Sequence, residues 1–389
     1  MKSQAYFPNL DALRFLAFLS VFLFHGFWTI DQTILHNGIY HIVYLATRIG
    51  HVGVNFFFVL SGFLISYLLL KEDEQYKKIS LKNFYLRRIL RIWPVYYLLT
   101  ISLIILLPFI YELVKNSDFN LNISKWKYFI FFSNYDLIQN KPTIPTLHSL
   151  WSISVEEQFY LVWPLLCLIF PGKKFIIPIV VVITQSLVFK WFNRANPEVL
   201  EWHTLSAILN MAVGALLAYL VLFNQGLVKK LSTNIPTYFI ILMYLALLGT
   251  CYFLEYGSAS PLLYISGQIA LAFLFAFVIF DQVYLTKSLF KIGKIKLFND
   301  WGKITYGLYC YHFLFLYVAL KLGQFIGWNH SLWGVLFLDT GIAFVLSIIF
   351  SKISYRYFER YFLSLKSKFQ KGMAISRDTV ARTVTNMNA

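Results

Sequence analysis

Residues 10–29 read LDALRFLAFLSVFLFHGFWT, a run in which most side chains are apolar. A helix of about 20 mainly apolar residues is long enough to cross the hydrocarbon core of a bilayer. The run could pass for a secretory signal peptide, but Asp11 and Arg14 lie at its head and no small-residue cleavage site follows. We therefore predict that it is retained as the first membrane-spanning helix.

Nine further runs of similar length and apolar character follow along the chain. They lie at 51–70, 90–110, 149–169, 174–192, 204–223, 235–255, 261–281, 303–325 and 332–352. Of the 389 residues, 58% are hydrophobic and only 13% are charged, which is about half the charged share of a soluble domain. The sequence predicts an all-α membrane protein with about ten transmembrane helices, and it excludes a soluble globular enzyme.

The basic residues predict how these helices are oriented. Most of the 34 Lys and Arg residues fall in every second connection, and the positive-inside rule places such connections in the cytoplasm. The alternate connections hold only Arg48, Lys115, Lys125, Lys127, Lys141 and Arg194. We therefore predict that both termini are cytoplasmic. The same rule accounts for the net charge of +16 without a nucleic-acid partner.

The chain is predicted to form one transmembrane domain over residues 1–364, followed by a polar, disordered cytoplasmic tail over 365–389. Its three cysteines, Cys167, Cys251 and Cys310, all lie inside apolar runs. They offer neither a disulfide framework nor a metal-ligand spacing, so we expect no metal.

Charged and titratable residues inside spans are costly and indicate function. Arg14 and His25 are eleven residues apart in the first span, which places them within about 20° of one helix face and roughly 16 Å apart along the axis. A cation near the cytoplasm with a base deeper in the membrane suits a long anionic cofactor. Alternatively, Arg14 pairs with Asp11 and snorkels, and His25 is a packed histidine bonded to a backbone carbonyl.

Three arginines, Arg87, Arg88 and Arg91, lie in the second cytoplasmic connection. Arg87 and Arg91 are four residues apart and should share a helix face. Guanidinium groups bind phosphates through paired hydrogen bonds, so this cluster is a candidate phosphate site. The alternative is ordinary anchoring at the membrane surface.

Glu156 and Glu157 are adjacent carboxylates in an apolar run, so both cannot face lipid. One could orient an imidazole or act as a general acid or base, or it could form a structural hydrogen bond. His148, at the outer mouth of the same span, is either a site residue or an interface histidine.

Three further polar residues lie within spans. His312 is a candidate site residue or a core histidine, and we assign no role to Asp339. Ser61 lacks the flanking pattern of a nucleophile elbow, so we expect Ser61 and Gly62 to allow close helix packing.

Six strings in this order resemble the bacterial membrane-bound acyltransferase-3 family, and the resemblance covers most of the chain. They are FPNLDALRFLAFLSVFLFH at 7–25, GVNFFFVLSGFLIS at 53–66, FYLRRILRIWPVYYL at 84–98, SLWSISVEEQFYLVWPLL at 149–166, WGKITYGLYCYHFLFLY at 301–317 and SYRYFER at 354–360. The sequence departs from the family pattern at Ala12, where Gly is frequent, and at Asn55, where Asp is frequent.

The resemblance implies transfer of an acyl group, commonly acetyl, from cytoplasmic acyl-CoA to a hydroxyl of a cell-envelope glycan or other carbohydrate. It implies catalytic roles for His25, Glu156 and Arg14, and acyl-CoA binding by Arg87, Arg88, Arg91 and Arg14. Other candidate site residues are His312, Glu157, Ser61, His148 and Glu359. The expected location is the bacterial inner (cytoplasmic) membrane. Some members carry an added extracytoplasmic domain that we do not expect here, so the chain should act alone or with separate partners.

Two questions stay open at this point. His25 is either a general base for direct transfer or a nucleophile that forms an acyl-imidazole, with Glu156 holding its tautomer. The chain could instead be a transporter or flippase of envelope precursors that uses the buried Arg, His and Glu residues as a substrate or proton relay, or a scaffold of envelope assembly. The acceptor, the acyl length and the oligomeric state cannot be read from the sequence.

Overall fold

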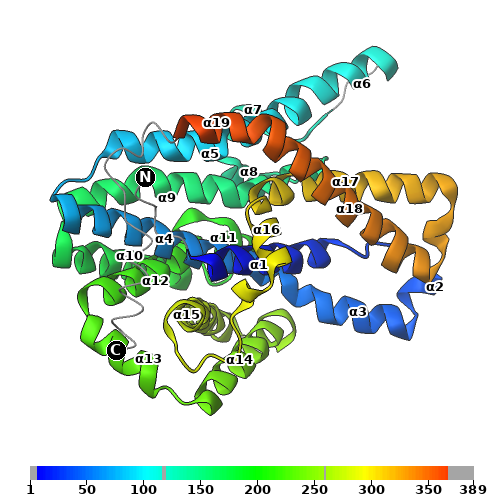
Figure 1. The fold of residues 1–389 in the computed structure, drawn as a ribbon. Coiled ribbons are helices and arrows are strands. Elements are labelled where there is room, and N and C mark those ends of the chain that lie inside the picture. Colours follow the sequence, from blue (N-terminus) through cyan, green and yellow to red (C-terminus); the bar gives the residue numbers. More distant parts are fainter. Residues whose placement is uncertain (1–6, 116–119, 258–259, 367–389) are drawn as a thin grey trace.

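The computed structural model describes residues 7–115, 120–257 and 260–366, and this part of the chain folds into helices without a strand (Figure 1). The predicted disordered tail lies outside it, except for residues 365–366. The helices are α1 (Pro8–His25), α2 (Gln32–Leu35), α3 (Gly38–Arg48), α4 (Gly53–Tyr76), α5 (Leu81–Ile101), α6 (Leu107–Lys115), α7 (Lys125–Phe129), α8 (Ser133–Gln139), α9 (Leu150–Ile169), α10 (Ile176–Phe192), α11 (Pro197–Trp202), α12 (Thr204–Phe223), α13 (Gln225–Asn234), α14 (Thr237–Tyr252), α15 (Pro261–Tyr284), α16 (Lys296–Gly302), α17 (Thr305–Ile326), α18 (Thr340–Ser354) and α19 (Arg360–Lys366).

Nine helical segments in the described ranges are long and apolar enough to cross a membrane. They are Gly38–Tyr76, Leu81–Leu113, Pro145–Ile169, Gly172–Phe192, Pro197–Phe223, Thr237–Gly257, Pro261–Tyr284, Thr305–Ile326 and Gly334–Leu365. They match the last nine predicted spans, and several extend well beyond them because the helices continue into polar sequence. The all-α membrane fold is therefore confirmed, while the cytoplasmic placement of both termini stays a prediction.

The remaining predicted span is α1, which is 18 residues long and carries several polar residues. It lies in the middle of the bundle in Figure 1, and its apolar side chains, such as Leu10 and Phe18, are buried. It packs against α4, α16 and α17. The first predicted span is thus a helix enclosed by protein, which explains how it tolerates polar residues that lipid would not.

Helices α4 and α12 approach each other more closely than ordinary side chains allow. A Cβ atom added at Gly62 would lie 2.0 Å from the backbone oxygen of Met211, and one at Gly214 would lie 2.0 Å from that of Val59. Small residues permit this kind of backbone contact between membrane helices. The predicted close packing is therefore found at Gly62, with a second glycine facing it from α12.

Candidate active site

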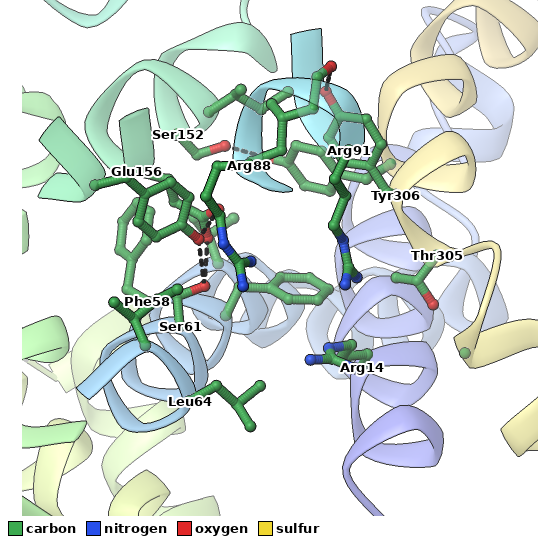
Figure 2. A pocket seen from close by; sticks show the side chains of 18 residues that line it. Arg14, Phe58, Ser61, Leu64, Arg88, Arg91, Ser152, Glu156, Thr305 and Tyr306 are labelled. Carbon is green, nitrogen blue, oxygen red and sulfur yellow. Dashed lines mark hydrogen bonds between the residues drawn. The ribbon is translucent and has the colours of Figure 1, made fainter. Parts of the chain in front are cut away.

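A cavity of about 120 Å³ lies between α1, α4, α5, α9 and α17, and we call it the arginine cavity (Figure 2). The guanidinium groups of Arg14, Arg88 and Arg91 all face it. It is lined by Arg14, Val54, Phe57, Phe58, Ser61, Leu64, Ile65, Arg88, Arg91, Ile92, Ser152, Ile153, Glu156, Tyr160, Gly302, Thr305, Tyr306 and Tyr309. Three cations from two helices face a single carboxylate among these residues, so the cavity favours an anionic ligand.

Glu156 is held on one wall of the arginine cavity by two hydroxyl groups. Ser61 Oγ donates to Glu156 Oε1 at 2.9 Å, and the Tyr160 hydroxyl donates to Oε2 at 2.9 Å. The guanidinium of Arg88 lies 5.7 Å from the centre of the Tyr160 ring, within the range of a cation–π contact. Ser61 therefore belongs to the polar wall of the cavity, and the helix packing predicted for it is provided by Gly62.

The arginines of α5 separate onto two faces. Arg88 and Arg91, three residues apart, line the cavity together. Arg87 is buried and lies 4.0 Å from Glu72, whose other oxygen accepts a hydrogen bond from the Ser80 backbone. Arg87 therefore does not line the arginine cavity, which lies on the face of α5 that carries Arg88, and its binding of acyl-CoA stays a prediction.

A second cavity, of about 510 Å³, is the histidine cavity. It is lined by Val21, Phe24, His25, His51, Val52, Val54, Asn55, Phe58, Leu137, Pro145, His148, Ser149, Trp151, Lys190, Leu200, Glu201, Trp202, Ala207, Asn210, Leu254, Tyr264, Gln268, Leu271, Tyr309 and Phe313. Val54, Phe58 and Tyr309 also line the arginine cavity, so the two cavities share a wall.

The His25 imidazole contacts neighbouring aromatic rings. It forms no hydrogen bond with any other described residue. Its ring centre lies 4.1 Å from that of Phe313 and 5.6 Å from that of His312. His312 is fully buried, and its Nδ1 lies 2.6 Å from the Tyr309 carbonyl oxygen. A carbonyl only accepts, so Nδ1 carries the hydrogen and Nε2 presents a lone pair, which no described residue contacts.

The surroundings of Arg14 and His25 differ from the predicted ones in one respect, which is the position of Glu156. Arg14 forms its ion pair with Asp11, as the alternative interpretation had it. Glu156 bonds Ser61 and Tyr160 and lines the arginine cavity, whereas His25 does not line it. Neither residue contacts the imidazole, because α9 presents Glu156 toward α4 and α5 and not toward the end of α1.

Four cavities lie next to one another in the bundle, and each shares lining residues with the next. The first, the Glu359 cavity, is lined by Asp11, Arg14, Arg91, Gly302, Lys303, Tyr306, Tyr355, Glu359 and Leu363. Arg14 and Arg91 also line the arginine cavity, which adjoins the histidine cavity as described. His25 and Phe313 line both the histidine cavity and a fourth cavity next to α3. Polar groups therefore follow one another from Glu359 to His25.

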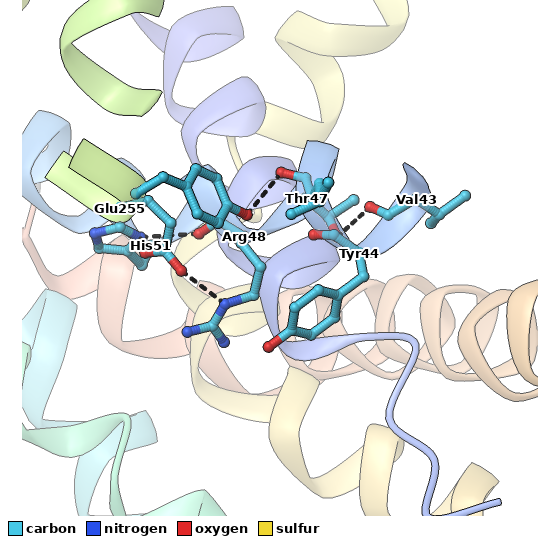
Figure 3. A network of polar contacts seen from close by, with 8 residues as sticks. Val43, Tyr44, Thr47, Arg48, His51 and Glu255 are labelled. Atoms are coloured by element: carbon cyan, nitrogen blue, oxygen red, sulfur yellow. Dashed lines mark hydrogen bonds and ion pairs between the residues drawn. The ribbon is translucent and has the colours of Figure 1, made fainter. Parts of the chain in front are cut away.

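An ionic network lies beside the histidine cavity (Figure 3). Arg48 Nε donates to Glu255 Oε1 at 2.9 Å, and His51 Nδ1 lies 3.5 Å from Glu255 Oε2. Arg48 also stacks on Phe24, with its guanidinium carbon 4.6 Å from the ring centre. The network joins the end of α3 to the segment after α14, and our sequence analysis assigned no role to any of these three polar residues.

The comparison with known families identifies the chain. A family described as "Acyltransferase domain" matches residues 7–355. The chain belongs to this acyltransferase family. The matched residues include every lining residue of the four cavities except Glu359 and Leu363, which lie just after residue 355.

Among curated proteins, the chain is 28% identical over 331 residues to the peptidoglycan O-acetyltransferase OatA of Listeria monocytogenes, covering 80% of the chain and 49% of that protein. It is 27% identical over 379 residues to the O-acetyltransferase OatA of Staphylococcus aureus, covering 92% of the chain and 57% of that protein. The chain thus spans about half the length of the curated relatives it matches. No solved structure matches it.

The opening motif of the acyltransferase anchors α1 within the bundle. Asn9 Nδ2 donates to the Gln282 carbonyl oxygen at 2.5 Å, and Asn9 Oδ1 accepts from the Gly293 backbone at 2.9 Å. Ala12 is fully buried, so its methyl group is accommodated where family members often have glycine. Asn55, the other departure, lines the histidine cavity.

The remaining predicted residues have defined places. Glu157 accepts from Trp93 Nε1 at 2.9 Å and lines none of the four cavities. Glu359 accepts from Ser354 Oγ at 3.1 Å, and His148 lines the histidine cavity. Asp339, which had no assigned role, accepts from Trp328 Nε1 at 2.5 Å.

Three ionisable residues of the histidine cavity, His51, Lys190 and Glu201, were not predicted from the sequence. Lys190 lies in an apolar run, so the rule that selected Arg14 could have found it. Glu201 lies in α11, between two predicted spans, and no pattern in the sequence marks it.

Proposed function

We propose that this protein is a membrane O-acyltransferase that transfers an acetyl group from acetyl-CoA, or another acyl-CoA, to a hydroxyl of a cell-envelope glycan. The observation that carries the proposal is the pair of adjacent cavities, with three arginines in one and His25 in the other. Membership of the acyltransferase family and the O-acetyltransferase names of the relatives support it.

The arginine cavity is suited to the donor. Arg14, Arg88 and Arg91 supply charge-assisted hydrogen bonds of the kind that phosphates accept. The cavity is too small for a whole nucleotide, so we assign it to the phosphate end of the pantetheine arm, with the nucleotide beyond the Glu359 cavity. The roughly 16 Å between Arg14 and His25 along α1 is a length that an extended arm can bridge.

The transfer itself is assigned to the histidine cavity. His25 removes the proton from the acceptor hydroxyl, whose oxygen attacks the thioester carbonyl. The carbon–sulfur bond breaks, the acetyl ester forms, and the released thiolate takes up a proton. Direct transfer with His25 as general base is preferred over an acyl-histidine, because it completes the transfer in one step and needs no covalent intermediate.

Glu156 receives a revised role in this scheme. Its two hydroxyl partners fix it on the wall of the arginine cavity, away from the imidazole. There it balances part of the charge of the arginines and holds Tyr160 against Arg88. We therefore treat Glu156 as a positioning residue for the donor arginines.

The orientation completes the proposal. The basic connections favour a protein of the bacterial inner membrane with both termini in the cytoplasm. Arg88 and Arg91 then lie toward the cytoplasmic donor, and the histidine cavity lies toward an acceptor at the outer face.

The test is transfer of radiolabelled acetyl from acetyl-CoA to isolated cell-wall glycan in membranes that contain the full chain. Removal of a general base lowers rates by about 10²–10⁴-fold, so His25→Ala should lose nearly all transfer. Exposed His36 provides the matched control, and His36→Ala should retain transfer. Glu156→Gln should raise the KM for acetyl-CoA more than it lowers kcat.

If His25→Ala and Glu156→Gln both kept near-normal turnover while Arg88→Ala did not, the chemistry would take place elsewhere. Movement of a separately labelled envelope precursor across the membrane, without formation of an acetyl ester, would favour the transporter over the enzyme.

A further inference from the structure

Lys190 is a buried cation in the histidine cavity, with only neutral partners. Its side chain is 2% exposed, and it lies on α10, facing α12 and α15. Its Nζ donates to Ser206 Oγ at 2.6 Å and to Gln268 Oε1 at 2.6 Å. Both acceptors are themselves buried, so the ammonium is held at a fixed point of the cavity wall.

The ammonium has one donor left after these two bonds, because a lysine presents three N–H groups. None of the ion pairs formed by the described residues includes Lys190. Buried charges in membrane spans are normally paired or line a water-filled cavity, since an unpaired charge costs several kcal/mol to desolvate. Lys190 lines a cavity but has no anionic partner in the described part of the chain, so an anion bound in that cavity would supply the missing countercharge.

The cavity also contains polar groups that can bind hydroxyls, set among apolar side chains. Glu201 and Asn210 line it together with His25, and Asn210 Oδ1 has no partner among the described residues. Its volume of about 510 Å³ lies within the range of about 300–1,000 Å³ typical of ligand pockets. Lys190 and His25 therefore face one space large enough for a sugar.

We propose that Lys190 binds a carboxylate of the acyl acceptor, so that the acceptor is a sugar acid whose reacting hydroxyl lies at His25. The assignment of that hydroxyl rests on the proposed function. A carboxylate fits better than a phosphate, because the cavity offers one ammonium and also holds Glu201, whereas phosphates favour arginine clusters such as the one in the neighbouring cavity.

The test is ligand-dependent thermal stability of the purified full chain in nanodiscs, with methyl β-glucuronide and methyl β-glucoside as probes. A ligand that binds only the folded state raises the unfolding midpoint according to its affinity. A hydrogen bond to a charged group contributes about 1.5–3 kcal/mol, so the glucuronide should bind about tenfold to a hundredfold more tightly than the glucoside.

Three variants identify the group responsible. Lys190→Met should abolish the difference between the two probes, and Lys190→Arg should retain part of it. Lys174→Met removes an exposed lysine just before α10 and should leave the difference unchanged. The unfolding midpoint of each variant without ligand shows whether it is folded. If Lys190→Met is not folded, Lys190→Arg alone tests the proposal.

Equal binding of glucuronide and glucoside by the wild type, or an unchanged preference in Lys190→Met, would overturn the inference. Tighter binding of glucose 6-phosphate than of glucuronide would overturn the choice of carboxylate. The result is independent of catalysis: a protein that binds the glucuronide through Lys190 but transfers no acetyl would refute the proposed function and leave the carboxylate site standing.

Discussion

The arginine cavity and the histidine cavity share a wall but differ in size and charge. The first is about 120 Å³ and presents three guanidinium groups, while the second is about 510 Å³ and mixes imidazoles, one ammonium and one carboxylate. A narrow cationic space suits a thin anionic chain, and a wide mixed space suits a bulky polar molecule. Under the proposed function, this contrast predicts that donor and acceptor enter from different sides of the shared wall.

The first prediction tests the arginine cavity by comparing two adjacent arginines of α5. Arg88→Ala should raise the KM for acyl-CoA by about tenfold to a hundredfold, because one charge-assisted hydrogen bond contributes about 1.5–3 kcal/mol. Arg87→Ala is the matched control. It breaks the contact with Glu72 and should lower stability while leaving that KM nearly unchanged. Initial rates against acyl-CoA concentration provide the measurement, and a larger KM effect in Arg87→Ala would contradict it.

The second prediction concerns the packing of α4, which contributes Val54 and Phe58 to the wall shared by the two cavities. Gly62→Ala places a methyl group 2.0 Å from the Met211 backbone oxygen, so the unfolding free energy should fall by about 1–3 kcal/mol.

Gly249, also inside a helix, is the control, because nothing lies within 4 Å of its added Cβ. Gly249→Ala should be neutral or stabilising. Thermal unfolding in nanodiscs compares the two variants, and equal midpoints would show that α4 and α12 are free to separate.

The third and smallest effect concerns the edge of the histidine cavity. Arg48 and Glu255 form an ion pair that is partly exposed, and such pairs contribute about 0.2–1 kcal/mol. A double-mutant cycle with Arg48→Met and Glu255→Gln should give a coupling energy in that range. A coupling energy above about 3 kcal/mol would contradict this prediction, because it would mean that the ion pair stabilises the protein as much as a buried pair does.

The sequence was informative about which residues matter and less so about which of them meet. Hydropathy located all ten predicted spans as helices, nine of them long and apolar enough to cross a membrane, because apolar length is a property of each segment alone. The cost of charge in a membrane selected Arg14 and Glu156, which do line one cavity. The predicted contact of Glu156 with His25 depended on which helices are neighbours, and no periodicity within a single helix contains that information.

The arginines of α5 illustrate the same limit. Helical spacing allows Arg91 to share a face with Arg87 or with Arg88, since both separations lie within one turn. Only the position of α9 and α17 around α5 decides that the cavity is on the side of Arg88. Lys190 was missed for a different reason. It is a charged residue inside a predicted span, so the criterion that selected Arg14 applied to it as well, but it was not considered.

The glycine contact between α4 and α12 has a consequence for genetics. A random-mutagenesis screen for inactive alleles will recover substitutions at Gly62 and Gly214 alongside those at His25, although neither glycine carries a reactive group. The two classes separate by abundance: an allele of His25 leaves the protein at its normal level in the membrane, whereas a glycine allele depletes it. Immunoblotting each allele before assigning it a role would keep the map of the reactive centre free of residues that only hold two helices together.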